Sequence, residues 1–146
     1  TRVRDVVRTA GPWALVRSTA WRDAAEVRRQ GGHMDAAFMT TWTFPFPGRE
    51  QQALEFAAQS EQFWSRHAAE GRCTEPEWFF FPDGINHLMV KGDRRVLEEV
   101  LDSDETRRIL ARGSLLLQDW HHGLGDTGGA AKRYIDDWAA ELATIG

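Results

Sequence analysis

The sequence of 146 residues is poor in several features that would assign a protein to a broad class. Its single cysteine, Cys73, cannot form an internal disulfide, which fits the reducing conditions of the cytoplasm. No apolar run approaches the roughly 20 residues that a transmembrane helix needs. The formal net charge of −4 offers no general attraction for nucleic acid. We therefore expect a cytoplasmic protein that binds neither a membrane nor nucleic acid.

Patterns for metals and nucleotides are also missing. His121 and His122 are adjacent, so on a strand they would point to opposite faces and could not easily share one ion. No Cys/His cluster has the spacing of a zinc site. Gly123, Gly125 and Gly128 match a dinucleotide-binding spacing formally, but no βαβ unit surrounds them. We expect no metal and no cofactor.

The first 33 residues differ from the rest of the chain. They hold seven arginines and three acidic residues, a net charge of +4, and they lack a clean hydrophobic period. Residues 30–34, QGGHM, can be back-translated into a purine-rich, ribosome-binding-site-like stretch just before an ATG codon. We expect residues 1–33 to be a basic extension outside the fold, either a translated leader before a true start at Met34 or a flexible basic arm. Residues 34–146 are then one bacterial domain.

Hydrophobic residues make up 42% of the chain, and seven of them are tryptophans, which often line cores, pockets or interfaces. Residues 36–46 alternate and predict a strand, and residues 49–72 have the three- and four-residue spacing of a helix that Gly71 would end. Residues 77–81 and 85–91 predict a hairpin around the turn at 82–84.

The second half of the domain repeats this order. Asp93 is placed to cap a helix, and Ser103 or Asp102 could cap a second helical segment that stops near Gly113. Residues 114–122 predict the last strand, residues 123–129 a loop, and residues 130–145 a C-terminal helix. The order βαββαβ predicts an α+β, ferredoxin-like fold with an extra C-terminal helix, in which both core helices cover one sheet face.

The predicted strands carry apolar residues on both faces. A sheet of this kind needs cover on its second face as well, because a monomer tolerates only a few hundred Å² of exposed apolar patch. The second cover would be another subunit, or the terminal helix folded across the sheet.

Residues 36–122 resemble the dimeric α+β barrel superfamily, in particular its antibiotic-biosynthesis-monooxygenase-like domains. The similarity rests on the strand that ends in FPG before a charged helix, and on the stretch VKGDRRVLEEVLDSDETRRIL. It implies a homodimer whose sheets face each other, with ligand between sheet and helices or within the barrel. Members include cofactor-independent monooxygenases acting on aromatic polyketides and haem-degrading enzymes. The Asn and His that the haem-degrading branch carries on its first strand and second helix have no counterpart here.

Aromatic residues and three polar side chains make up the candidate site. His87 shares a strand face with Ile85 and Met89 and could act as a base, or could be a hydrogen-bonded core histidine. The candidate ligand-binding residues are Trp42, Phe44, Phe38, Trp120, His122 and Asn86.

Three functions fit this pattern. The first is binding of a small apolar or aromatic molecule. The second is a cofactor-independent monooxygenase or isomerase acting on an aromatic substrate, which requires a closed cavity holding a histidine or an asparagine. The third is a purely structural dimerisation module, in which tryptophans fill the space. The sequence leaves open whether the protein is an enzyme.

Overall fold

The computed structural model describes residues 34–146, so the basic extension and the question of a start at Met34 lie outside the described residues. The chain runs through β1 (Ala36–Trp42), α2 (Glu50–Ala69), β2 (Glu77–Phe80), β3 (Asn86–Gly92), α3 (Arg94–Leu101), α4 (Asp104–Leu116), β4 (His121–Asp126) and α5 (Gly128–Ile145).

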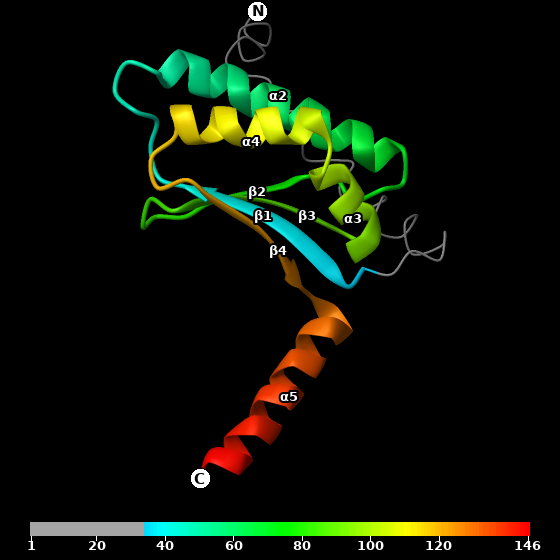
Figure 1. Cartoon of the computed structure of the whole chain (residues 1–146). Coiled ribbons are helices and arrows are strands. Elements are labelled where there is room, and N and C mark those ends of the chain that lie inside the picture. Colours follow the sequence, from blue (N-terminus) through cyan, green and yellow to red (C-terminus); the bar gives the residue numbers. More distant parts are fainter. Residues whose placement is uncertain (1–33) are drawn as a thin grey trace, which may run out of the picture.

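The four strands form one sheet in the order β2-β3-β1-β4, and every neighbouring pair is antiparallel. Helices α2 and α4 lie side by side over one face of this sheet (Figure 1). The predicted α+β, ferredoxin-like βαββαβ fold with an additional C-terminal helix is therefore confirmed.

Alternation along β1 and β3 divides the sheet into two faces. Along β1, Ala36, Phe38, Thr40 and Trp42 are buried under the helices, and the residues between them are half-buried on the other face. Residues directly opposite each other in an antiparallel pair share a face. The pairing of Phe38 with Val90 and of Thr40 with Leu88 therefore extends the covered face onto β3.

Short polar residues cap the first turns of α3 and α4, as predicted. The Asp93 carboxylate accepts hydrogen bonds from the backbone amides of Arg95 at 2.9 Å and Val96 at 3.2 Å, and it starts α3. The Ser103 hydroxyl accepts from the amide of Thr106 at 3.2 Å and starts α4. Gly71, just after α2, has a φ of +74°, a conformation that glycine adopts without strain.

The predicted last strand at residues 114–122 is wrong. Helix α4 continues to Leu116, because Gly113 is buried against the Trp120 ring and Leu116 and Leu117 reach the core. The strand is instead His121–Asp126, most of it in the glycine-rich stretch predicted as a loop. Its pairing with β1 holds it extended despite two glycines, which have low strand propensity.

The first strand is shorter than predicted. Regular pairing stops at Trp42, and one isolated bridge joins Pro45 to Leu117. The alternation therefore does not carry Phe44 onto the covered face, where it was expected beside Phe38 and Trp42. The Phe44 side chain is 63% exposed and its ring lies against Gly84 at the hairpin turn.

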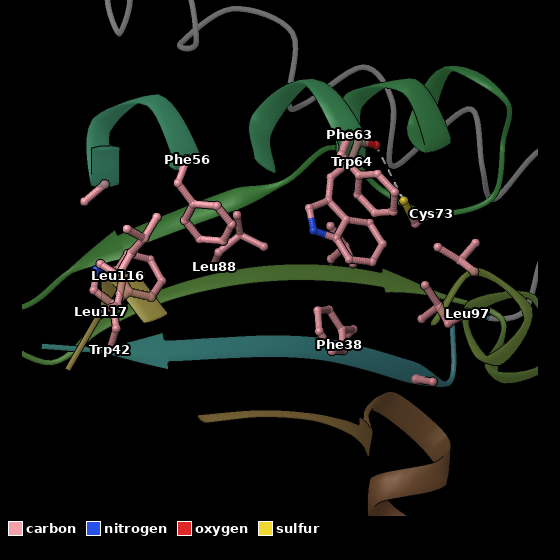
Figure 2. Packing of buried hydrophobic residues seen from close by; sticks show 14 residues of the cluster. Phe38, Trp42, Phe56, Phe63, Trp64, Cys73, Leu88, Leu97, Leu116 and Leu117 are labelled. Atoms are coloured by element: carbon pink, nitrogen blue, oxygen red, sulfur yellow. Dashed lines mark hydrogen bonds between the residues drawn. The ribbon is translucent and has the colours of Figure 1, made fainter. Parts of the chain in front are cut away.

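The core lies between the sheet and α2 (Figure 2). Phe38 points up from β1 to Trp64 of α2, with ring centroids 5.3 Å apart, and Trp64 meets Phe63 at 4.9 Å. Cys73 is buried beside them, and its thiol approaches the carbonyl oxygen of Trp64 at 3.9 Å.

The second sheet face has no cover within the described part of the chain. Helix α5 continues from the end of β4 and projects away from the sheet (Figure 1). The terminal helix therefore does not fold across this face, which was one of the two expected covers. No helix among residues 34–146 is long and apolar enough to cross a membrane.

Candidate functional site

A cavity of about 290 Å³ lies between the covered sheet face and the two helices above it. The sheet contributes its floor through Phe38, Thr40, Trp42, Trp78, Phe80 and Leu88. Helix α2 contributes Ala53, Phe56, Ala57, Ser60, Phe63 and Trp64, and α4 contributes Thr106, Ile109 and Leu110. Most of these side chains are apolar, and several are aromatic.

The mouth of the cavity lies where the start of α2 approaches the hairpin. Glu50, Leu54 and Phe80 line the cavity and are exposed to solvent. Beside them, the Trp78 indole donates a hydrogen bond to the Glu61 carboxylate at 2.5 Å. This bond ties edge strand β2 to α2 and fixes the Trp78 ring as one wall of the cavity.

Few polar groups face the cavity, and most of them are already bonded. The Ser60 hydroxyl donates to the Phe56 carbonyl at 2.9 Å, and the Thr106 hydroxyl donates to the Val100 carbonyl at 2.6 Å. The Thr40 hydroxyl differs, because no hydrogen bond to it is found among residues 34–146. Thr40 is buried in the floor between Phe38 and Trp42. Its hydroxyl is therefore free to bond a molecule in the cavity.

Trp120 forms the wall beneath α4. Its ring lies 6.5 Å from Trp42 and 6.0 Å from Phe56, centroid to centroid. A methyl group added at Gly113 would meet this ring at 2.4 Å, so only glycine allows the helix to approach so closely. The indole nitrogen is buried without a partner among the described residues.

The structure brings together three of the predicted ligand-binding residues. Phe38, Trp42 and Trp120 all line the cavity. Three others lie outside it. The Phe44 ring lies against Gly84 in the hairpin turn, and His122 is on exposed edge strand β4 with its ring 6.2 Å from Phe38. The Asn86 amide donates to the Thr43 carbonyl at 2.9 Å, a bond that fastens the end of β1.

The structure does not bring the candidate base His87 together with the aromatic candidates Trp42 and Phe44. His87 pairs with Thr41, so it lies on the uncovered sheet face, opposite the face of Trp42. There its Nδ1 lies 3.4 Å from the Met39 sulfur, and the Phe81 ring meets it edge-on at 5.2 Å. The prediction that His87 and Met89 share a strand face is confirmed.

Sequence reasoning missed the helical half of the site. Phe56 and Trp64 fall within the predicted helix and Thr40 within the predicted first strand, and none of them was a candidate site residue. Their helical and alternating spacings place them on the inward faces but do not reveal that space remains between those faces. Trp78 gave no signal at all, because its role depends on a bond to Glu61, 17 residues away.

Two titratable side chains sit at the closed end of the core. Burial, and then the charges of Arg66 and Arg72, lower the pKa of His67 from its ordinary value. Burial, assisted by Glu75, raises the pKa of Cys73 to about 12. Neither side chain lines the cavity, so neither supplies acid–base or nucleophilic chemistry to it.

Comparisons with known proteins give weak structural similarities. No family model matches the sequence, and no curated protein matches it. A conserved protein from Methanosarcina mazei matches with a TM-score of 0.49 and 15% identity, over 65% of this chain and 95% of that one. A protein of unknown function from Bacteroides thetaiotaomicron, described as a possible oxidoreductase, matches with a TM-score of 0.49 and 9% identity over 65% and 100%. A Pseudomonas aeruginosa protein matches with a TM-score of 0.47 and 19% identity over 67% and 100%. At this level they carry no assignment of function.

Proposed function

We propose that the protein binds a small, flat, apolar molecule in the cavity between its sheet and helices. The observation that carries this proposal is an aromatic-lined cavity with one unbonded hydroxyl, that of Thr40, in its floor. Binding pockets for small molecules are mostly apolar, with a few polar groups that fix orientation. A volume of about 290 Å³ lies at the lower end of the usual range, which favours a ligand of two or three fused rings.

The mouth of the cavity supports occupancy by a ligand. Glu50, Leu54 and Phe80 line this mouth and are exposed, so the aromatic walls can be reached from solvent. A flat apolar ligand that fills the space would remove apolar surface of both the ligand and the walls from water, which favours binding by roughly 25 cal/mol per Å².

Binding is favoured over catalysis by the identity of the lining residues. Enzymatic oxidation or isomerisation was expected to require a histidine or an asparagine in the cavity. Among the described residues, neither type lines it, and His87 lies on the other sheet face. The walls are held apart by the bond of Trp78 to Glu61 and by the contact of Trp120 with Gly113, which argues against a module whose tryptophans simply fill the core.

We also propose that two copies pair through their uncovered sheet faces, as dimeric α+β barrels do. Met39, Met89, Phe79 and His87 share this face, and Met39 and Met89 lie directly opposite each other on adjacent strands. Apolar side chains in the middle of an antiparallel sheet normally lie against a second layer. A second copy would supply that layer, since α5 does not.

A pair of isosteric probes tests ligand binding. Equilibrium dialysis with 1-naphthol and 1-methylnaphthalene compares a hydroxyl with a methyl group on the same ring system. We expect both to bind the native protein. Thr40→Val should weaken 1-naphthol binding up to about tenfold, the loss of one hydrogen bond, and leave 1-methylnaphthalene unchanged.

Filling the cavity provides the second arm of the experiment. Ala57→Phe places a ring in the space and should abolish binding of both probes, whereas Ala58→Phe, on the exposed side of the same helix, should not. Circular dichroism would verify that both variants are folded. Absence of binding by the native protein, or equal binding by Ala57→Phe, would refute the proposal.

A further inference from the structure

Helix α5 presents an apolar stripe that nothing in the described part of the chain covers. Its members are Tyr134, Ile135, Trp138, Leu142 and Ile145, each more than half exposed. They recur at three- and four-residue steps, so they form one stripe along the helix, and Lys132, Asp136 and Asp137 lie away from it. The helix is 18 residues long, about 27 Å, and extends away from its own sheet (Figure 1).

A second exposed apolar surface lies at the opposite end of the sheet. We name it the hairpin patch, and its residues are Phe44, Phe80, Phe81 and Ile85, all exposed. Phe80 packs beside Trp78 on the cavity side of the sheet and Phe81 beside Phe79 on the other side, so the patch wraps around the tip of the hairpin. The hairpin end is marked by the pairing of Trp42 with Asn86. The pairing of Ala36 with Asp126 marks the other end, where β4 leads into α5.

We propose that α5 is an arm that packs on the hairpin patch of a second copy of this chain. The inference rests on the proposed pairing through the uncovered sheet faces. In a symmetric dimer with its two-fold axis across the strands, opposite ends of the two sheets meet, and each contact occurs twice. Each arm then reaches the partner's hairpin. With the axis along the strands, the arms would meet each other and leave both hairpin patches bare.

The area required for a stable dimer supports this role. The four strands have seven, four, seven and six residues and cover roughly 400 Å² on one face, whereas a standard interface buries about 800 Å² on each partner. The sheet face alone therefore provides about half of the area. Five large apolar side chains on α5, at about 100 Å² or more each, provide the remainder.

The arm would also affect the cavity of the partner. Phe80 belongs to the hairpin patch and lines the mouth of the cavity. An arm packed on this patch would lie beside the mouth, so each chain would help to enclose the ligand of the other.

Charge substitutions on two sides of α5 test the arm. Leu142→Asp places a carboxylate in the stripe, and Ala140→Asp places the same charge on the opposite side of the same helix turn. Because each stripe contact occurs twice in the dimer, Leu142→Asp should raise the dimer dissociation constant at least about 100-fold, as measured by sedimentation equilibrium. Ala140→Asp should leave it within about threefold. A native monomer, or equal effects of the two variants, would overturn the proposal.

Cysteine cross-linking locates the contact, since Cys73, the one native thiol, is buried. A mixture of Trp138→Cys and Phe81→Cys chains should form a covalent dimer on oxidation, and neither variant alone should. A covalent dimer of Trp138→Cys alone would mean that the arms pair with each other, and would overturn the proposal. Dialysis with 1-naphthol separates the two proposals, because a monomer that binds 1-naphthol refutes the arm and leaves the binding function intact.

Discussion

The layer between the sheet and the helices has two ends that use the same kinds of side chain differently. At the end near α3, the Trp64 ring lies 5.3 Å from the Phe38 ring and 4.9 Å from the Phe63 ring, so these three rings form one contacting cluster that closes the inner end of the cavity. At the end near the hairpin, Trp42 lies 5.9 Å from Trp78 and 6.5 Å from Trp120, and these rings border the cavity. We refer to these as the packed end and the hollow end.

The difference lies in what holds each ring. The side chains of Phe38 and Phe63 have no polar atom, so only van der Waals packing determines how their rings are oriented. Trp78 is held at its nitrogen by Glu61, and Trp120 is held on its benzene ring by Gly113. While its contact at the edge is intact, such a ring does not turn into the neighbouring space, so it acts as a wall. Aromatic content alone therefore does not distinguish a filled core from a lined pocket.

The largest effect should come from removing a ring at the packed end. Phe38 is 1% exposed, and Phe38→Ala should cost about 3–5 kcal/mol of unfolding free energy, because the lost contacts and the new void add. Urea unfolding measures this cost. Phe44→Ala, which removes the same ring from an exposed site, is the matched control and should cost well under half as much. If Phe38→Ala and Phe44→Ala lower the unfolding free energy equally, the covered core contributes no more to stability than the exposed hairpin end does.

Adding one methyl group at the packed end should be the next largest effect. At Gly92 a new Cβ would lie 2.9 Å from the Arg72 carbonyl oxygen, which is backbone and cannot move aside cheaply. Gly92→Ala should therefore cost about 1–3 kcal/mol, as overpacking does. Gly125→Ala in β4, with nothing within 4 Å of the new Cβ, is the control for replacing a strand glycine. Thermal unfolding measures the stability of both variants. If Gly92→Ala is as stable as the native protein, the backbone at the packed end can move to accommodate the added methyl group.

The same change at the hollow end should cost less. At Gly113 the new methyl group would overlap the Trp120 ring, but that ring borders the cavity and can shift into it. The gain in helix propensity, about 1 kcal/mol, offsets part of the strain. We expect Gly113→Ala to stay within about 1 kcal/mol of the native stability and to weaken 1-naphthol binding. If Gly113→Ala lowers the stability and leaves 1-naphthol binding intact, the Trp120 ring does not shift into the cavity and the expected difference between the two ends is wrong.

The smallest effect concerns charge at the packed end. His67 has a pKa lowered by burial, so the unfolded chain binds a proton at a higher pH than the folded chain does. Stability should therefore fall as the pH drops below about 6.5, through the interval down to the folded-state pKa. His67→Gln should flatten this pH dependence in urea titrations, whereas His121→Gln, on exposed β4, should not. An unchanged slope in His67→Gln would mean that other groups cause the pH dependence.

Much of the fold follows from the sequence because its local signals agree. The alternation of β1, the hairpin turn and the caps Asp93 and Ser103 each act within a few residues. The last strand was misassigned because two long-range effects override local preference. Contact with Trp120 keeps Gly113 helical, and pairing with β1 holds the glycine-rich segment extended.

The candidate site was predictable in part for a related reason. Phe38 and Trp42 follow from alternation on one strand, and that pattern is local. His87 could not be placed relative to Trp42, because the sequence does not specify which face of each strand the helices cover. The cavity itself follows from distances between rings on different elements, and no spacing within one element encodes those distances.

The buried thiol of Cys73 makes transient opening of the packed end measurable. Its thiol is buried and its pKa is raised to about 12, so at neutral pH it is protonated and out of reach of alkylating reagents. A reagent in solution can modify it only during the moments when this end of the domain opens. With an excess of reagent, the rate at which Cys73 is alkylated therefore reports how often this end opens. No label has to be introduced, because the thiol is native.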